Sequence, residues 1–147
     1  MSEANIAVVR GMWAAFLRND GETANAAFDP DVEWDGTNLP DGEIAHGLDA
    51  VVAHVRRWAE MWETWEVELE DVIDAGEGRV IAFFRERGRS KAGLDINERH
   101  SELYVVRDGK IVYRKGFSDA DEALVEVGLG NSQRAARRAS RRRPGCQ

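Results

Sequence analysis

The stretch Trp65-Glu66-Val67-Glu68-Leu69-Glu70 alternates apolar and acidic side chains with a period of two. Successive side chains of a strand point to opposite faces, so this pattern predicts a β-strand with one buried and one solvated face. The residues from 64 onward therefore predict a sheet, and this sheet decides the fold.

Three more strands follow, and a turn signal precedes each of them. The turns are Gly76-Glu77-Gly78, residues 89–93 and Asp108-Gly109, the last of which is a strong hairpin signal. They predict strands over residues 79–89, from about 94 to 106, and over 111–118. Together these segments predict an antiparallel meander, one face of which needs a cover.

The residues before this meander supply the cover. Residues 4–18 carry apolar side chains at helical spacing, a short second helix stops at Asp29-Pro30, and a third begins near Leu48. A short strand over residues 32–34 and a closing helix over 119–128 complete the chain. We therefore expect an α+β fold, a cone-shaped curved antiparallel sheet (a cystatin-like roll) whose N-terminal helices enclose an apolar pocket.

The net charge of −7 hides an asymmetry along the chain. Residues 131–147 contain six Arg and no acid, which leaves 14 basic against 27 acidic side chains in the remainder. We expect one domain over residues 1–130 and a disordered Arg-rich tail over 131–147. Because an acidic body repels phosphate, contact with nucleic acid or a membrane is expected only through the tail.

Several classes of protein are excluded by composition. The sequence has no apolar run near the roughly 18 residues that a membrane span needs, and no basic region followed by an apolar stretch at its start. The single cysteine, Cys146, excludes a disulfide framework and a Cys-based zinc site. We expect a cytoplasmic protein that uses no cofactor.

Five short motifs stand out over residues 4–129: residues 13–20, residues 28–34, His46-Gly47, residues 108–111, and residues 117–119 with Ala123-Leu124. In order and spacing they resemble those of SnoaL-like proteins of the nuclear-transport-factor-2-like superfamily, which includes ketosteroid isomerases. The resemblance implies the cone-shaped fold and frequent homodimers. It does not imply one activity, because this fold hosts isomerases, cyclases, epoxide hydrolases and non-catalytic binders.

The catalytic positions of these enzymes fall on unsuitable residues in this chain. The resemblance places the acid/base Asp of SnoaL-type polyketide cyclases and limonene epoxide hydrolases at Gly116, which has no side chain. It places the basic Asp of ketosteroid isomerases at Trp34 or, with a one-residue slip, at Asp35, and their oxyanion-binding Asp near Leu103. The known chemistries therefore do not transfer.

Two polar residues remain as catalytic candidates. Val112, Arg114, Gly116 and Ser118 share the strand face that the resemblance assigns to the pocket, so Arg114 would be a cation suited to a carboxylate or enolate oxygen. The alternatives are that Arg114 pairs with Glu102 or Glu98, or lies at a dimer seam. Asp35 is the candidate base, because partial burial beside Trp34 would raise its pKa; the alternative is that it merely opens the turn before Gly36.

Four tryptophans on three elements are expected to converge on the pocket, where an aromatic lining would suit a flat polycyclic ligand. With Leu103, they are the expected substrate-binding residues: Trp13, Trp34, Trp58 and Trp62. The alternative is that these rings simply fill the core. His46, His54 and His100 have no metal-ligand spacing, so no metal site is expected; His54 is expected to be solvated and His100 to face away from the pocket.

Two functions from different classes follow from these residues. One is an isomerase, cyclase or hydratase that acts on a hydrophobic carbonyl compound by proton transfer, with Asp35 as base and Arg114 as oxyanion stabiliser. The other is a non-catalytic module that binds a small hydrophobic molecule or serves dimerisation. In either case we expect a homodimer that forms through the outer face of the sheet, around Tyr104 and Tyr113.

Overall fold

The computed structural model of the protein describes residues 2–39 and 42–129, so the Arg-rich tail lies outside the described residues. In chain order the elements are α1 (Ser2–Leu17), α2 (Gly21–Ala26), β1 (Phe28–Asp35), β2 (Ile44–His46), α3 (Leu48–Glu60), β3 (Trp62–Gly76), β4 (Arg79–Ser90), β5 (Asp95–Arg107), β6 (Lys110–Phe117) and α4 (Glu122–Glu126). Among these residues no helix is both long and apolar enough to cross a membrane.

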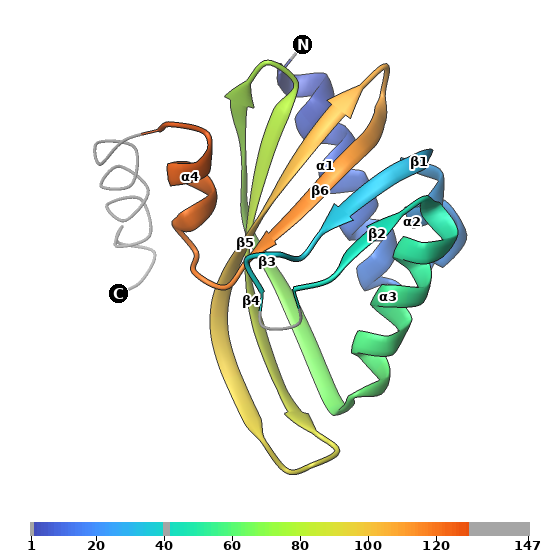
Figure 1. The fold of residues 1–147 in the computed structure, drawn as a ribbon, viewed down its shortest axis with the longest axis vertical. Helices are drawn as coiled ribbons and strands as arrows, with labels where there is room; N and C mark the ends of the chain where they lie inside the picture. The colour runs from blue at the N-terminus through green and yellow to red at the C-terminus, as the bar shows by residue number, and fades with distance from the viewer. Residues whose placement is uncertain (1, 40–41, 130–147) are drawn as a thin grey trace.

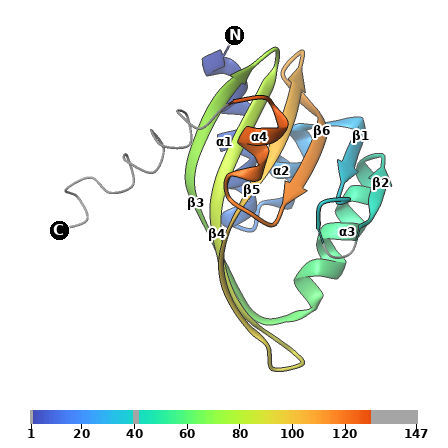
Figure 2. The same cartoon turned by 60° about the vertical axis from the view of Figure 1, so that its left-hand side comes forward.

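The strands form one six-stranded sheet in the order β2-β1-β6-β5-β4-β3. All neighbouring pairs are antiparallel except β1 and β6, which are parallel. The sheet is curved, with α1, α2 and α3 on one side and α4 on the other (Figures 1 and 2). The predicted α+β architecture is therefore confirmed, although the parallel pair and the short strand β2 were not predicted.

Both faces of the sheet are covered near its middle, which explains the continuous apolar run in β4. Val80, Ala82 and Phe84 belong to the core beneath the N-terminal helices. Ile81 and Phe83 alternate with them and belong to a smaller core beneath α4. A strand that is buried on both faces reads as an unbroken apolar segment, whereas β3 keeps its alternation because one of its faces is solvated.

The register of β5 corrects two expectations about its faces. Leu103 packs in the core beneath α4, on the opposite side of the sheet from Trp13, so it does not line the helix-covered interior. Tyr104 faces that interior and is fully buried there, so it cannot form part of a dimer contact on the outer face. The reason is that alternate residues of a strand point to opposite faces, and the sequence alone left the choice of face open.

A bulge in β6 corrects a third expectation. Val105 of β5 is paired with Tyr113 of β6, but the next residue, Val106, is paired with Ile111, so Val112 is left as the extra residue of β6. Ile111 therefore faces the helix-covered core, whereas Val112 lines a pocket on the surface. An extra residue in one strand changes which side chains share a face, so Val112 does not lie with Arg114 as predicted.

Substituting Gly116 tests how tightly the interior is filled. A Cβ atom at Gly116 would lie 2.7 Å from Trp34 Cη2 and 2.9 Å from Leu39 Cδ1. We expect Gly116→Ala to lower the free energy of unfolding by about 1–3 kcal/mol, because overpacking forces neighbours to shift. Urea unfolding measures this change.

Gly11 provides the matched control. It lies exposed in α1, and a Cβ atom there would meet no atom within 4 Å. Gly11→Ala should raise the free energy of unfolding by about 1 kcal/mol, because glycine is a poor helix former. Equal effects of the two substitutions would show that the space over Gly116 is not filled as described.

Candidate functional site

A hydrogen-bonded link joins α1 to the sheet inside the helix-covered core. Trp13 of α1 is 3% exposed, and its ring lies 5.1 Å from that of Phe84. Its indole Nε1 donates to the Tyr104 hydroxyl at 2.9 Å. Burial raises the pKa of Tyr104 well above its ordinary value, so this phenol remains a neutral donor.

The link continues to a buried ion pair. The Tyr104 hydroxyl donates to Glu102 Oε1. The same oxygen accepts from Arg114 Nε at 2.9 Å and from Arg114 Nη2 at 2.8 Å. Burial lowers the pKa of Arg114, but the carboxylate of Glu102 outweighs burial and the net pKa lies above the ordinary value. Arg114 thus faces inward, and it is also paired with Glu102.

Aromatic rings surround the Arg114 guanidinium. Its central carbon lies between 5.5 and 6.0 Å from the centres of four rings: Trp13, Phe28, Trp34 and Tyr104. Rings at this distance attract a cation through their negative faces. The ion pair and the rings together hold Arg114 in place, and the Glu102 carboxylate balances the guanidinium charge that an incoming anion would otherwise meet.

A second buried carboxylate lies on the same face of the sheet, in β4. Glu86 Oε2 accepts from the indole Nε1 of Trp65 at 2.7 Å and from that of Trp58 at 3.3 Å. Burial raises the pKa of Glu86 above its ordinary value, and the nearby Glu102 carboxylate adds to this. Sequence reasoning missed Glu86, although it stands two residues after Phe84 and therefore shares its face.

His100 lies beside Glu86. Its Nε2 is 3.5 Å from Glu86 Oε1 and 3.3 Å from Glu98 Oε2. Its ring stacks on Phe84 with the ring centres 5.8 Å apart. The expectation that His100 faces away from the interior is wrong, because β5 turns residues 100, 102 and 104 toward the helices rather than residues 101 and 103.

Asp35 lies elsewhere. In the register of β1 and β6 it lies opposite Lys115. Its carboxylate accepts a hydrogen bond from the Tyr113 hydroxyl at 2.7 Å. The preceding residue, Trp34, packs in the interior instead. The Asp35 carboxylate also accepts from the backbone nitrogen of Thr37 at 3.0 Å and from its hydroxyl at 2.6 Å. Burial raises the pKa of Asp35, but the bonds from Thr37 and Tyr113 outweigh burial and lower it overall. The expected rise is therefore wrong, and Asp35 opens a turn.

The four predicted tryptophans do gather on the helix-covered side. Trp13 and Trp34 belong to the same buried core, close to Arg114. Trp58 bonds to Glu86, and its ring contacts that of Trp62 at 5.4 Å in an edge-on arrangement. These two rings are only partly buried. The tryptophans therefore run from a closed end at Trp13 to a more open rim at Trp62.

Histidine 54 also differs from its expected position. It is 8% exposed rather than solvated, its ring lies 5.3 Å from that of Trp34, and its Nδ1 is 2.9 Å from Glu43 Oε2. Among the described residues, no three His, Cys, Asp or Glu side chains gather in a way that would hold a metal ion.

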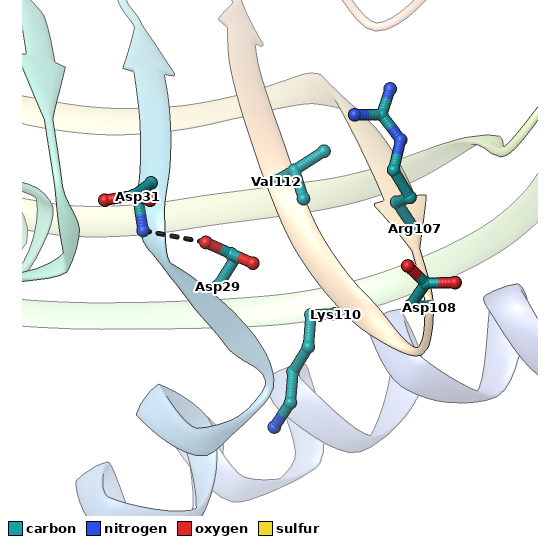
Figure 3. Close-up of a pocket in the computed structure, with 6 residues that line it drawn as sticks. All are labelled: Asp29, Asp31, Arg107, Asp108, Lys110 and Val112. Carbon is teal, nitrogen blue, oxygen red and sulfur yellow. Dashed lines mark hydrogen bonds between the residues drawn. The ribbon is translucent and has the colours of Figure 1, made fainter.

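A polar pocket of about 310 Å³ opens on the surface, away from this interior. Figure 3 shows its lining residues around the start of β1 and the β5–β6 hairpin: Asp29, Asp31, Arg107, Asp108, Lys110 and Val112. It forms where β1 loses its pairing with β6 between Phe28 and Glu33. Its lining is mostly charged and of both signs, so it is not the apolar pocket that the sequence predicted.

Comparison with known proteins supports one family. An uncharacterised protein of Mycobacterium tuberculosis is 36% identical over 127 residues, covering 84% of this chain and 95% of the relative. The crystal structure of a nuclear-transport-factor-2-like protein from Burkholderia thailandensis is 28% identical, with a TM-score of 0.71 over 86% of this chain and 97% of that one. TerC, crystallised with polyporic acid, is 20% identical, with a TM-score of 0.69 over 84% of this chain and 97% of that one.

The SnoaL-like domain matches residues 9–114, which include the second half of α1, the whole of the interior ion pair and the Glu86 cluster. The match covers most of the chain and agrees with the fold. This chain therefore belongs to the SnoaL-like domain family.

Proposed function

We propose that this chain binds a flat, apolar carbonyl compound on the helix-covered face of its sheet and transfers a proton on that compound. One observation carries the proposal: the Glu86 carboxyl is buried, has a raised pKa and is held by two indole N–H groups beside the partly open tryptophan rim. A general base works best when its pKa lies near the working pH, and burial moves a carboxyl in that direction.

The chemistry that this arrangement supports is an enolisation. The Glu86 carboxylate takes a proton from the carbon next to the carbonyl, and the electron pair of that C–H bond moves onto the carbonyl oxygen as an enolate. Glu86 then returns the proton to a carbon of the same molecule, so the net change is an isomerisation. The aromatic rings around Glu86 provide apolar walls for such a substrate.

Fold similarity adds modest support. TerC, which shares the fold, crystallised with polyporic acid, a small organic molecule. The sheet of the present chain is covered by helices on the side where four tryptophans gather. A small-molecule partner is therefore the natural proposal for this interior.

The proposal changes the roles that the sequence suggested. Asp35 lies on the other face of the sheet with a lowered pKa, so Glu86 replaces it as the base. Arg114 is paired with Glu102, so it acts by holding the interior together rather than by receiving an enolate. The rim, at Trp58 and Trp62, is where the substrate enters.

A second candidate is a non-catalytic binder of a small hydrophobic molecule. The space over Gly116, where related cyclases carry their acid/base group, is occupied by Trp34 and Leu39. This observation favours a protein that retained the interior of the family without its chemistry. The expected homodimer and cytoplasmic location stay predictions, and a dimer contact would involve the solvated face of the sheet rather than Tyr104.

Replacing Glu86 tests the proposed proton transfer. The probe is 2-tetralone, a flat bicyclic ketone, and deuterium uptake from D₂O at its carbon next to the carbonyl is followed by NMR. We expect the wild-type protein to accelerate uptake over buffer, and Glu86→Gln to reduce the protein-dependent rate by about a hundredfold or more. Gln keeps the shape of the side chain but cannot accept the proton.

Asp35→Asn is the matched control and should leave the protein-dependent rate unchanged. If that variant loses the rate while Glu86→Gln keeps it, the assignment of the base is wrong. If neither the wild type nor any variant accelerates uptake, the non-catalytic candidate replaces the proposal.

The raised pKa of Glu86 also predicts a pH dependence of stability. Because the folded state holds this proton more tightly than the unfolded chain, Glu86 favours folding most at pH values below its ordinary pKa of 4.5. That contribution is lost as the pH rises through the higher pKa of the folded state. The free energy of unfolding of the wild type, relative to Glu86→Gln, should therefore fall between pH 4 and pH 7. Urea unfolding over this range measures it, and a constant difference would contradict the raised pKa.

A further inference from the structure

The five tryptophans of the chain differ in what their indole N–H groups do. Three donate to side chains of the protein: Trp13 to Tyr104, and Trp58 and Trp65 to Glu86. The indole nitrogens of Trp34 and Trp62 are buried and have no hydrogen-bond partner among the described residues.

Such unpaired donors are unusual. Most buried polar groups in folded proteins have a hydrogen-bond partner, and an unpaired one costs folding free energy. Trp34 is 6% exposed, so water does not reach its nitrogen easily. Two unpaired donors on the face that is proposed to bind a ligand point to acceptor atoms that the ligand itself supplies.

The two unpaired tryptophans are arranged along one helix. The Trp34 ring lies 5.3 Å from that of His54, and the Trp62 ring lies 5.4 Å from that of Trp58. His54 and Trp58 are four residues apart in α3, so they share one face and are separated by about 6 Å along the helix axis. The rings that carry the two unpaired donors therefore lie beside neighbouring turns of one helix.

The charges nearby favour a neutral ligand. Arg114, whose guanidinium carbon lies 5.5 Å from the Trp34 ring, is already paired with Glu102. At the other end, Trp58 holds the Glu86 carboxylate. A ligand carboxylate would approach two carboxylates and gain no unpaired cation from Arg114, whereas a carbonyl oxygen needs only the N–H donors.

We propose that the ligand is an elongated, flat, neutral molecule with a carbonyl oxygen at each end, such as a diketone or quinone, and that the indole N–H groups of Trp34 and Trp62 bind these oxygens. The inference rests on the proposed binding of a carbonyl compound to this face. Because the Trp34 nitrogen is sealed, the ligand displaces a covering side chain as it enters. Leu39, which packs against the same core, lies over Gly116 together with Trp34 Cη2 and belongs to neither a helix nor a strand, is the one that we expect to move.

Indole resonances of the wild-type protein test the proposal directly. The probe is 2,6-diacetylnaphthalene, added to protein with ¹⁵N-labelled tryptophan, and 2,6-diethylnaphthalene is the control without acceptor oxygens. A new hydrogen bond moves an N–H proton downfield, so the diketone should move the indole protons of Trp34 and Trp62 downfield more than those of the three paired tryptophans. The hydrocarbon should not. Failure of the diketone to bind at millimolar concentration, or equal shifts with both probes, would overturn the proposal.

An isosteric substitution gives a second, quantitative test. Replacing Trp34 by 3-benzothienylalanine exchanges the N–H for a sulfur atom and keeps the shape of the ring. The affinity for the diketone, measured by calorimetry, should fall by roughly tenfold, since a hydrogen bond to a buried acceptor is lost, and the affinity for the hydrocarbon should stay the same. A change of less than twofold for the diketone would contradict the proposal.

Trp13 is the matched control for this substitution, because its N–H is already bonded to Tyr104. The same replacement there should lower the melting temperature, whereas at Trp34 it removes an unpaired donor and should not. The two proposals also fail separately. Loss of deuterium uptake in Glu86→Gln with no change at Trp34 would refute only the assigned donors, whereas N–H-dependent binding without any proton transfer would refute only the catalysis.

Discussion

The ion pair between Arg114 and Glu102 is the interaction on which the interior depends. Both side chains come from the middle of the sheet, on neighbouring strands β6 and β5, and both are nearly buried. A buried ion that loses its partner costs far more than the pair contributes, so neither residue can be changed alone without a large loss of stability. The pair explains why a cation can exist among Trp13, Phe28 and Trp34 at all.

The pair also determines how the helices meet the sheet. Glu102 accepts a hydrogen bond from the Tyr104 hydroxyl, and the Tyr104 oxygen in turn accepts one from the indole N–H of Trp13 in α1. A chain of three polar contacts thus connects β6 to the first helix through a core that is otherwise apolar. Hydrogen bonds in such surroundings demand a defined geometry, because an unmade bond leaves a buried polar group unpaired. The position of α1, and with it the shape of the interior, follows from that demand.

Much of the fold could be predicted from the sequence, and the errors have a common physical cause. The alternation at Trp65–Glu70 and the hairpin at Asp108-Gly109 predicted the sheet correctly. It was harder to predict which residues of the later strands face the N-terminal helices, because β4 and β5 are apolar on both sides where α4 adds a second cover. Leu103 and His100 were each assigned to the wrong face, and the bulge at Val112 leaves no mark in the pattern.

The candidate site was harder still to predict, because it depends on the different surroundings of two carboxylates, Glu86 and Glu102, on the same face of the sheet. Glu102 has an arginine and a phenol as partners, whereas Glu86 has indole N–H groups and a histidine 3.5 Å away. The first environment is an ion pair with Arg114. The second holds a carboxyl whose pKa is raised by burial, which is the property a proton-transferring group needs. Apart from Tyr104, the partners that make this difference are distant in the sequence: Arg114 for Glu102, and Trp58 and Trp65 for Glu86. The chemistry of this interior is therefore a product of the tertiary fold, in which burial raises the pKa of Glu86 and the nearby Glu102 carboxylate adds to the rise.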